Sequence, residues 1–372
     1  MKILILKENL KKALSVVEKI VSKNLTLPIL NNILLKTEKN FLCLVSTNLE
    51  IGIKYWVLAK INEEGSLVVP SRLFSGFIST INNEKVNIDS KGNSIDIKSD
   101  DYKAQIKGFD SQEFPLIPEI DNQDTIEINA KEFCEALAQI INFCSINQSR
   151  PEISGVYLNF QKEKLSLVAT DSFRLAEKNI FIKEGFKKDH SFIIPQKTAQ
   201  EIINIFAGEE SVKIYFNTNQ ILLESYYREV NHPKVQLTST LIQGDFPNYK
   251  DIIPKQNETK VIVVTDDFAN KLKIASLFSN KTNEIRVDIN CDGGIDISSQ
   301  NTDIGENQSH IQAQVEGKEQ SICFNYKYLT DGVLSPQSKS IIFEVNGDSG
   351  PSVIKSISDP NYLYLVMPIK NT

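Results

Sequence analysis

The sequence predicts an α+β fold made of three repeated domains, each with two helices packed against antiparallel sheets. Three observations support this prediction. An amphipathic helical segment occurs three times along the 372 residues, a polar segment containing a threonine follows each copy, and a short apolar strand then leads into a second helical segment. Such self-similarity over about 125 residues is typical of a repeat architecture.

The first helix of each copy is indicated by apolar residues at the spacing of one helix face. These residues are Leu10, Leu14, Val17 and Val21 in the first copy, Phe133, Leu137, Ile140 and Cys144 in the second, and Phe268, Leu272, Ala275 and Ser279 in the third. The threonine follows the first apolar residue by 37 residues at Thr47 and Thr170, and by 34 residues at Thr302. This near-constant distance places the same order of elements in all three copies.

Each copy continues with a strand that ends at a helix start. These strands are predicted at residues 67–70, 192–195 and 322–325, and the second helices at residues 73–81, 202–206 and 329–334. The remaining segments alternate apolar and polar residues in the period of half-buried strands, as at Val86 and Ile88. We expect domains at residues 1–122, 123–256 and 257–372, and only residues 228–236 form a loop without a counterpart in the other copies.

The composition indicates an ordinary globular protein. Hydrophobic residues make up 41% of the chain and charged residues 24%, and the net charge of -6 argues against a protein that covers its surface with phosphate contacts. The five cysteines form no C-x-x-C pair, so neither a disulfide framework nor a zinc site is expected. Because no segment has the length of a signal-peptide core or a membrane span, we expect a cytoplasmic protein.

Motifs for catalysis and cofactor binding are absent from the sequence. It contains no P-loop, dinucleotide-binding, zinc-protease or nucleophile-elbow motif, so no cofactor is expected. The three histidines, His190, His232 and His310, have no cysteine or carboxylate at ligand spacing and are interpreted as solvated or capping residues. Asp266 and Asp267 stand at a helix start, where acidic side chains complement the helix dipole.

Charge and apolar residues off the core stripe indicate contact surfaces. On the first helix, Lys12, Lys19 and Lys23 fall opposite the apolar stripe and form a basic face. On the first helix of the third copy, Leu277 points away from the core with Phe278 beside it, which favours contact with another protein surface.

Four motifs, in order along the repeat, resemble the family of the bacterial DNA polymerase III beta subunit, the sliding clamps. They are Thr26-Leu27-Pro28-Ile29-Leu30, Ala169-Thr170-Asp171-Ser172-Phe173-Arg174-Leu175-Ala176, Asp245-Phe246-Pro247-Asn248-Tyr249 and Val366-Met367-Pro368-Ile369. The resemblance implies a non-catalytic processivity factor, a head-to-tail homodimeric ring that encircles double-stranded DNA without sequence preference. Twelve helices spaced roughly 10 Å apart would give a circle about 38 Å across, which admits a duplex.

The resemblance also implies partners and sites. A pocket would bind short peptides of the DNA polymerase III alpha subunit, clamp-loader subunits and other polymerases or repair proteins. By motif, its residues are Ile153, Thr170, Arg174, Leu175, Pro247, Ile252, Ser352, Val353, Leu365, Met367, Pro368 and Ile369. Ser172 and Phe173 replace a frequent Gly-His pair, and Asp251 stands where a basic residue is common, so a different peptide preference is expected.

The residues expected to face DNA are Lys12, Lys19, Lys23, Asn24, Arg72, Gln148, Arg150 and Lys197. Asn24 stands where relatives often carry arginine, and Lys23 is its expected substitute. At the dimer interface, Ala104 and Ile106 of one subunit are expected to meet Leu277 and Phe278 of the other. An acidic cluster near Asp303 and Glu306 would lie opposite Arg72 or Lys103.

Two other classes of protein were weighed. An α+β enzyme with a substrate pocket between the second and third domains would need converging titratable groups, whereas the expected lining is almost wholly apolar. A β-rich structural or adhesive repeat protein would need an export signal.

Overall fold

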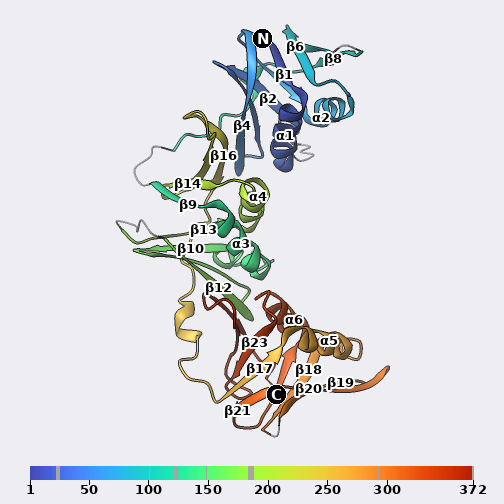
Figure 1. Cartoon of the computed structure of the whole chain (residues 1–372), viewed down its shortest axis with the longest axis vertical. Coiled ribbons are helices and arrows are strands. Elements are labelled where there is room, and N and C mark those ends of the chain that lie inside the picture. The colour runs from blue at the N-terminus through green and yellow to red at the C-terminus, as the bar shows by residue number, and fades with distance from the viewer. Residues whose placement is uncertain are drawn as a thin grey trace. The chain divides into compact units, whose positions relative to one another are not determined.

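The computed structural model describes residues 1–21, 26–99, 101–120, 125–147, 149–182, 188–291 and 293–370. The chain forms two compact units (Figure 1). Unit 1 comprises residues 1–134 and 200–241, and unit 2 comprises residues 135–199 and 242–372. The second copy of the sequence repeat is therefore divided between the two units.

Unit 1 contains a branched antiparallel sheet and the helices α1 (Lys7–Val17) and α2 (Ser71–Thr80), which contact each other. The main path of the sheet is β8 (Lys103–Lys107), β7 (Ser94–Lys98), β6 (Lys85–Lys91), β1 (Lys2–Leu6), β4 (Ile51–Glu63), β16 (Pro233–Thr240), β15 (Gln220–Tyr226), β14 (Ser211–Phe216) and β9 (Thr125–Asn129). Three further strands, β2 (Asn32–Glu38), β3 (Phe41–Thr47) and β5 (Ser66–Pro70), branch from β4. The stripe Leu10, Leu14 and Val17 is buried as predicted.

Unit 2 contains two antiparallel sheets and the helices α5 (Thr265–Ser276) and α6 (Tyr326–Leu334), which also contact each other. The larger sheet has the order β13 (His190–Pro195), β10 (Gly155–Gln161), β11 (Lys164–Thr170), β12 (Arg174–Phe181), β25 (Tyr362–Val366), β24 (Ser352–Ser356), β23 (Ser340–Val345), β17 (Thr259–Val264) and β21 (Gln314–Gly317). The smaller sheet is β20 (Gly305–Gln312), β19 (Gly294–Asn301), β18 (Glu284–Asn290) and β22 (Gln320–Asn325). Helices α3 (Ala130–Ile140) and α4 (Gln196–Phe206) each contribute residues to both units.

Strand register confirms the repeat. Leu34 of β2 pairs with Val45 of β3, and the pair 123 residues later, Tyr157 and Val168, joins β10 to β11. The sheets also continue from one copy into the next, because β4 pairs with β16 and β12 pairs with β25. In the third copy the corresponding strand is β20, and both β20 and β8 lie at the ends of their sheets.

All six predicted helices are present, but some end earlier than the apolar periodicity predicts. Helix α1 stops at Val17, and a 3-10 turn, Glu18–Ile20, follows in which Ile20 is buried and the Val21 amide donates to the Glu18 carbonyl. The tighter turn satisfies the free carbonyls at the helix end, so Val21 lies beyond the helix. Cys144 lies beyond α3 for the same reason, after a 3-10 turn at Ile141–Phe143.

The unmatched loop is shorter than predicted. Pro233 to Gln236 belong to β16, which pairs with both β15 and β4. Val235 and Leu237 of β16 are both buried, as expected for alternate residues of a strand that pairs on both sides, so β16 begins earlier than the sequence predicts.

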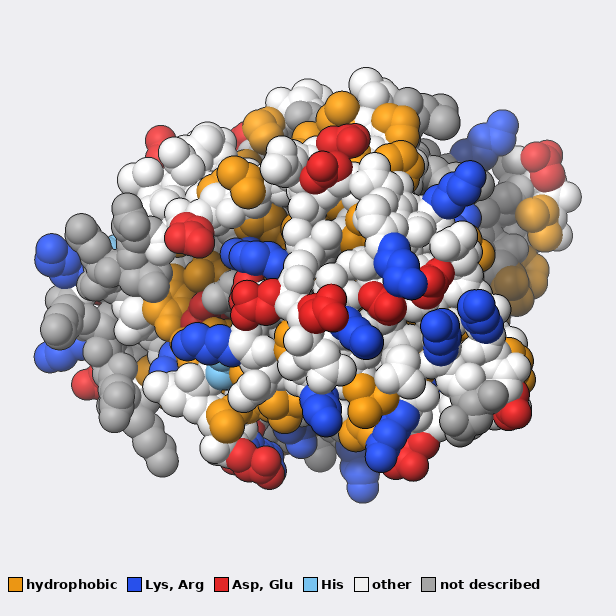
Figure 2. Space-filling view, turned by 90° about the horizontal axis from the view of Figure 1, so that it is seen from above, with side chains coloured by type: hydrophobic (Ala, Val, Ile, Leu, Met, Phe, Trp, Pro, Cys, Tyr) orange, Lys and Arg blue, Asp and Glu red, His pale blue; other side chains and the backbone are white. Residues whose placement is uncertain are grey.

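On the face seen in Figure 2, Lys and Arg side chains are interspersed with Asp and Glu side chains. Within the described residues, no helix combines the length and apolar character needed to cross a membrane.

Candidate functional site

Part of the predicted peptide pocket is an apolar cluster within unit 2, which we call the floor. Val168, Leu175, Tyr249 and Leu365 pack together and are buried. Leu175 of β12 pairs directly with Leu365 of β25, so the second and third copies each supply part of the floor. Five half-buried residues pack around it: Tyr157, Phe246, Ile253, Leu363 and Met367.

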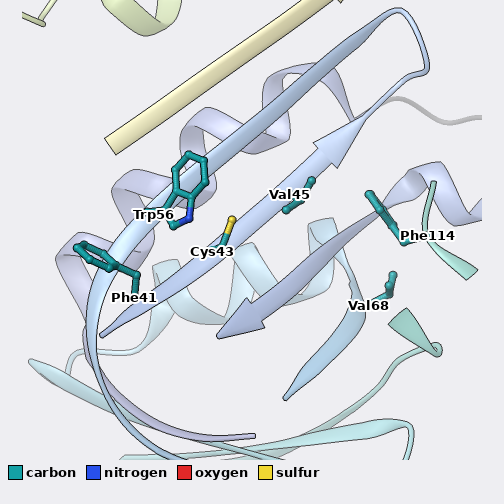
Figure 3. Close-up of a cluster of buried hydrophobic side chains, with 6 residues drawn as sticks. All are labelled: Phe41, Cys43, Val45, Trp56, Val68 and Phe114. Atoms are coloured by element: carbon teal, nitrogen blue, oxygen red, sulfur yellow. The ribbon is translucent and has the colours of Figure 1, made fainter. Parts of the chain in front are cut away.

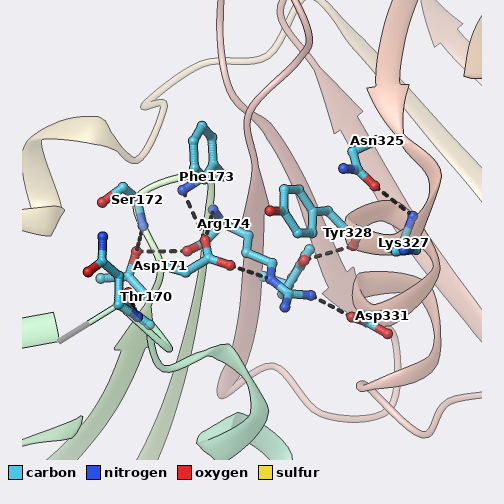
Figure 4. A network of polar contacts seen from close by, with 12 residues as sticks. Thr170, Asp171, Ser172, Phe173, Arg174, Asn325, Lys327, Tyr328 and Asp331 are labelled. Carbon is cyan, nitrogen blue, oxygen red and sulfur yellow. Dashed lines mark hydrogen bonds and ion pairs between the residues drawn. The ribbon is translucent and has the colours of Figure 1, made fainter. Parts of the chain in front are cut away.

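The turn between β11 and β12 leads directly into the floor residue Leu175, and its hydrogen bonds are drawn in Figure 4. The Thr170 hydroxyl donates to the Arg174 carbonyl at 2.7 Å, and the amides of Phe173 and Arg174 both donate to Asp171 Oδ1 at 3.0 Å. These bonds hold Ser172 at a φ of 79°, a left-handed conformation that is uncommon for residues other than glycine. The turn leaves the Phe173 side chain 58% exposed, with its ring stacked on that of Tyr328 of α6.

Arg174 connects the turn to the third copy (Figure 4). Its Nε lies 2.9 Å from Asp171 Oδ2 and its Nη1 lies 2.5 Å from Asp331 Oδ2 on α6, and its guanidinium lies 4.6 Å from the centre of the Tyr328 ring. Burial opposes the charge, but Tyr364 and the hydrogen bonds to Asp331 and Asp171 raise the pKa of Arg174. The arrangement is a charged clasp between the two copies.

The C-terminal segment is hydrogen-bonded to this turn. The Met367 amide donates to the Phe173 carbonyl at 2.9 Å, and the Ile369 amide donates to the Cys323 carbonyl at 2.8 Å. Met367, Pro368 and Ile369 are half-buried as a result. A thioether with several rotatable bonds at this position can adapt to different bound side chains.

The other predicted pocket residues take different positions. Ser352 and Val353 are buried on β24, where they pair with Val366 and Leu365 of the neighbouring strand β25. Ile153 is buried in a 3-10 helix, Pro151–Ile153, outside the floor cluster. Pro247 is half-buried and Ile252 is exposed, both on the segment that contains Tyr249.

Sequence reasoning missed several residues of the site. Tyr249 completes the floor, and the Tyr157 and Phe246 rings stack beside it with centroids 4.6 Å apart. Burial raises the pKa of the Tyr249 phenol, with a smaller contribution from Glu177. The Asp245-Phe246-Pro247-Asn248-Tyr249 motif contains Phe246 and Tyr249 and could have indicated them. No sequence signal indicates Asp331, because it lies 157 residues from Arg174.

The predicted DNA-facing residues of unit 1 are exposed on neighbouring elements. Lys12 lies on α1, Lys19 on the 3-10 turn and Arg72 in the first turn of α2. Glu18 joins these elements, because it accepts hydrogen bonds from the hydroxyls of Ser71 at 3.0 Å and Ser75 at 2.8 Å.

The remaining basic positions lie elsewhere. Lys197 is exposed on α4. Arg150 contacts the pocket turn, because its Nη1 donates to the Ser172 hydroxyl at 3.0 Å while its Nε pairs with Glu152 at 3.0 Å. Lys23, Asn24 and Gln148 lie outside the described residues.

The predicted dimer residues differ in accessibility. Leu277 is 68% exposed just after α5, and Phe278 beside it is half-buried. On the edge strand β8, Ala104 is half-buried and Ile106 is 4% exposed. Ile106 therefore contributes little side-chain surface, although the backbone of β8 lies at a sheet edge.

Two of the three histidines have contacts that can be described. His310 Nδ1 lies 2.8 Å from Asp296 Oδ1, because cross-strand pairing of β20 with β19 brings the two together, and 56% of its side chain stays exposed, in keeping with a solvated histidine. The His232 ring stacks on Phe41 with centroids 4.0 Å apart. In the part of the chain that the structure describes, no three His, Cys, Asp or Glu side chains are grouped to hold a metal ion.

Three copies of a two-helix, antiparallel-sheet module, joined by strand pairing between the first and second copies and between the second and third, define the class of DNA clamps. Comparisons with known proteins give the family. The models of the N-terminal, central and C-terminal domains of the DNA polymerase III beta subunit match residues 1–118, 127–248 and 250–370. The chain belongs to the DNA polymerase III beta subunit family.

Individual relatives agree with this assignment. The beta sliding clamp of Staphylococcus aureus (strain Mu50 / ATCC 700699) is 27% identical over 365 residues, which cover 95% of this chain and 94% of the relative. A DNA polymerase sliding clamp from Bacillus subtilis superposes with a TM-score of 0.93 at 25% identity, and each chain is fully covered. The beta subunit from Thermotoga maritima has a TM-score of 0.91 at 24% identity, again with full coverage, and supports the fold.

As a member of this family, the protein is a processivity factor of a DNA polymerase holoenzyme and is not itself catalytic. The hypothesis of an α+β enzyme with an interdomain substrate pocket is therefore set aside.

Proposed function

We propose that this protein closes head to tail into a two-subunit ring around double-stranded DNA in the cytoplasm. Its unit 2 pocket would hold short peptides of the DNA polymerase III alpha subunit, clamp-loader subunits and other polymerases or repair proteins. The apolar floor formed by Leu175 and Leu365, with Met367 beside it, is the observation that carries the peptide-binding function. Domain limits at residues 1–122, 123–256 and 257–372 are part of the proposal.

The pocket chemistry suits an extended peptide with an apolar end. Aliphatic and aromatic side chains would bury that end, while the backbone of the Thr170–Arg174 turn and the C-terminal segment supplies polar groups near the rim. A surface that includes methionine is suited to several partners.

The test of the pocket uses the purified alpha subunit as the probe. Met367→Ala is expected to weaken its binding about tenfold or more in surface plasmon resonance, as is typical of an anchor residue in a small interface. The matched control is Ile357→Ala, which truncates a half-exposed residue of unit 2 outside the floor cluster. Equal loss in both variants, or no loss with Met367→Ala, would contradict the pocket assignment.

The proposed ring rests on two of the strands that lie at sheet ends, β8 and β20. In the first copy β4 pairs with β16 of the second, and in the second copy β12 pairs with β25 of the third. The equivalent strand of the third copy, β20, and the strand equivalent to β16 and β25 in the first copy, β8, are both sheet ends. Pairing β20 with β8 of another subunit would continue the same pattern, and two such contacts close a ring.

The repeat also predicts the register of this contact. Gly52 of β4 pairs with Thr238, and its counterpart Leu175 pairs with Leu365. For the contact we propose that Glu306 of β20, which pairs with Gln300 of β19, lies opposite Gln105 of β8, which pairs with Asp96 of β7. Glu306 would then have Lys103 and Lys107 as diagonal cross-strand neighbours, which gives the contact complementary charge.

A cysteine pair tests the register. Directly opposite residues in an antiparallel pair have the Cα separation that a disulfide needs, whereas residues offset by two do not. Gln105→Cys combined with Glu306→Cys, in a Cys291→Ser background that removes the exposed native thiol, should give a covalent dimer on a non-reducing gel. Gln105→Cys with Gln308→Cys is the offset control, and a monomer near 42.0 kDa by light scattering would exclude the ring.

Topological binding to DNA has its own signature. A closed ring needs few phosphate contacts, so Lys12, Lys19, Arg72 and Lys197, together with Lys23, Asn24, Gln148 and Arg150, would guide the duplex rather than grip it. Protein loaded on circular DNA should therefore remain bound at high salt and be released when the DNA is linearised. Equal loss from circular and linear DNA at high salt would indicate ordinary electrostatic binding.

A further inference from the structure

Unit 1 contains a groove at the position that corresponds to the unit 2 pocket. Its floor is the cluster Phe41, Cys43, Val45, Trp56, Val68 and Phe114 (Figure 3). By strand register, Val45 corresponds to Val168, and its neighbour Leu34 corresponds to Tyr157. Phe114 and Phe246 likewise precede a proline on the segment that closes each copy, and each packs against its floor cluster.

The deepest part of the unit 1 groove is filled by the chain itself. Gly52 stands where unit 2 has Leu175, and a Cβ atom on Gly52 would lie 2.7 Å from Ile117 Cδ1. Ile117 thus occupies the space that the larger residue fills in unit 2. A cavity of about 340 Å³ remains, lined by Leu34, Cys43, Val45 and Phe114 among other residues.

One apolar residue that lines this cavity, Leu116, is exposed to solvent. Leu116 is 95% exposed, whereas the next residue, Ile117, is half-buried and packs against the floor cluster. A leucine held beside an apolar floor adds contact area for a bound side chain without any change of the core.

The charges of the groove differ from those of unit 2. The Glu38 carboxylate already has partners within the groove: Lys36 Nζ lies 3.2 Å from its Oε1, and Trp56 Nε1 donates to its Oε2 at 2.8 Å. Lys54, half-buried in the lining, makes no ion-pair contact with a carboxylate of the described residues, although its positive charge also acts on Glu38. The remaining charged lining residue, Glu119, lies on the segment that closes the first copy.

The position equivalent to Lys54 in unit 2 is Glu177, whose Oε1 accepts a hydrogen bond from Asn179 Nδ2 at 2.8 Å. The sign of the charge beside the two floors is therefore reversed. A ligand carboxylate is favoured beside Lys54 and disfavoured beside Glu177.

We infer that the unit 1 groove is a second docking site, which takes a short extended peptide segment with apolar side chains on either side of a carboxylate. An apolar side chain lies between Leu116 and the floor formed by Leu34 and Val45, and the carboxylate pairs with Lys54. The inference rests on the proposed peptide-binding role of the unit 2 groove, from which the equivalence is drawn.

The experiment uses the full-length Met367→Ala variant, so that the contribution of the unit 2 pocket to peptide binding is reduced. The probe is a short fluorescein-labelled peptide with glutamate between two leucines, and its matched control has lysine in place of the glutamate. Fluorescence anisotropy should show the glutamate peptide binding about tenfold more tightly than the lysine peptide, the size expected when one charge contact becomes a repulsion.

Two variants in the Met367→Ala background locate the site. Lys54→Glu should reverse the preference between the two peptides, and Leu116→Ala should weaken both about threefold or more. Leu116→Ala changes a residue that is almost fully exposed, so the thermal unfolding temperature should remain unchanged.

Absence of binding of either peptide to Met367→Ala overturns the inference, as does equal binding of both peptides that Lys54→Glu and Leu116→Ala leave unchanged. Neither result affects the alpha-subunit test of the unit 2 pocket, which compares Met367→Ala with the unmodified protein. The two proposals can therefore fail separately.

Discussion

Arg174 shows how one side chain can join two copies of the repeat. It pairs with Asp171 on its own turn and with Asp331 on α6, and it lies over the Tyr328 ring. Only 13% of its side chain is exposed, so these contacts are partly shielded from water. Asp171 also accepts two backbone amide bonds, so it keeps hydrogen-bond partners even without the arginine.

Replacing Arg174 tests the clasp. Arg174→Met keeps an apolar stem of similar length but removes the ion pairs and the cation–π contact, and should lower the free energy of unfolding by about 1–2 kcal/mol. Urea denaturation measures the change. Arg150→Met is the matched control, because Arg150 is half exposed and its pairing with Glu152 at the surface should contribute little to stability; equal effects would mean that Arg174 contributes no more than a surface arginine.

Sequence reasoning found part of this site. The structure brings Thr170, Arg174, Leu175, Leu365 and Met367 together. The sequence names all five because they lie in compact motifs, and their role in peptide binding stays a prediction. Asp331, Tyr328 and Tyr157 carry no local pattern that links them to those motifs, and the tertiary fold alone brings them to the turn.

At the scale of elements, periodicity predicted all six helices and the strands that precede the second helix of each copy. The burial of one face imposes that periodicity, so it is visible in the residues. Helix ends were less predictable, since they depend on whether a 3-10 turn follows, as after Val17 and Ile140. The length of β16 was underestimated because its second partner, β4, lies far away in the chain.

The packing of β4 against the segment after β8 gives a second prediction. Gly52→Ala places a Cβ atom against Ile117 and should destabilise the protein by about 1–3 kcal/mol through overpacking. The double variant with Ile117→Ala should recover part of this loss, which a double-mutant cycle measured by thermal unfolding would reveal.

Gly76 supplies the matched control. It lies within α2, and a Cβ atom there meets nothing within 4 Å, so Gly76→Ala should stabilise the helix by about 0.5–1 kcal/mol. Similar effects of the two glycine substitutions would show that Ile117 does not press on Gly52.

At the scale of the whole molecule, the net charge of -6 is compatible with DNA binding by enclosure, since a ring does not depend on a phosphate-coated surface. The proposed subunit contact instead makes local charge important, because Glu306 would lie near Lys103 and Lys107. Exposed contacts of this kind are weakened by salt.

A charge swap tests this contact. Glu306→Lys should raise the dimer dissociation constant about tenfold, since two weak attractions become repulsions. Combining it with Lys103→Glu and Lys107→Glu should restore most of the affinity in analytical ultracentrifugation. Failure of the combined variant to improve on Glu306→Lys alone would contradict the proposed register.

The compact units do not coincide with the sequence repeats, because β16 of the second copy belongs to unit 1 and β25 of the third copy extends the sheet of the second. A fragment cut at the end of the first repeat would therefore leave the long strand β4 with a bare hydrogen-bonding edge, and such an edge recruits other chains. Single repeats of this protein should accordingly aggregate when produced alone, and no single cut separates the two compact units, because the chain passes between them after residues 134, 199 and 241.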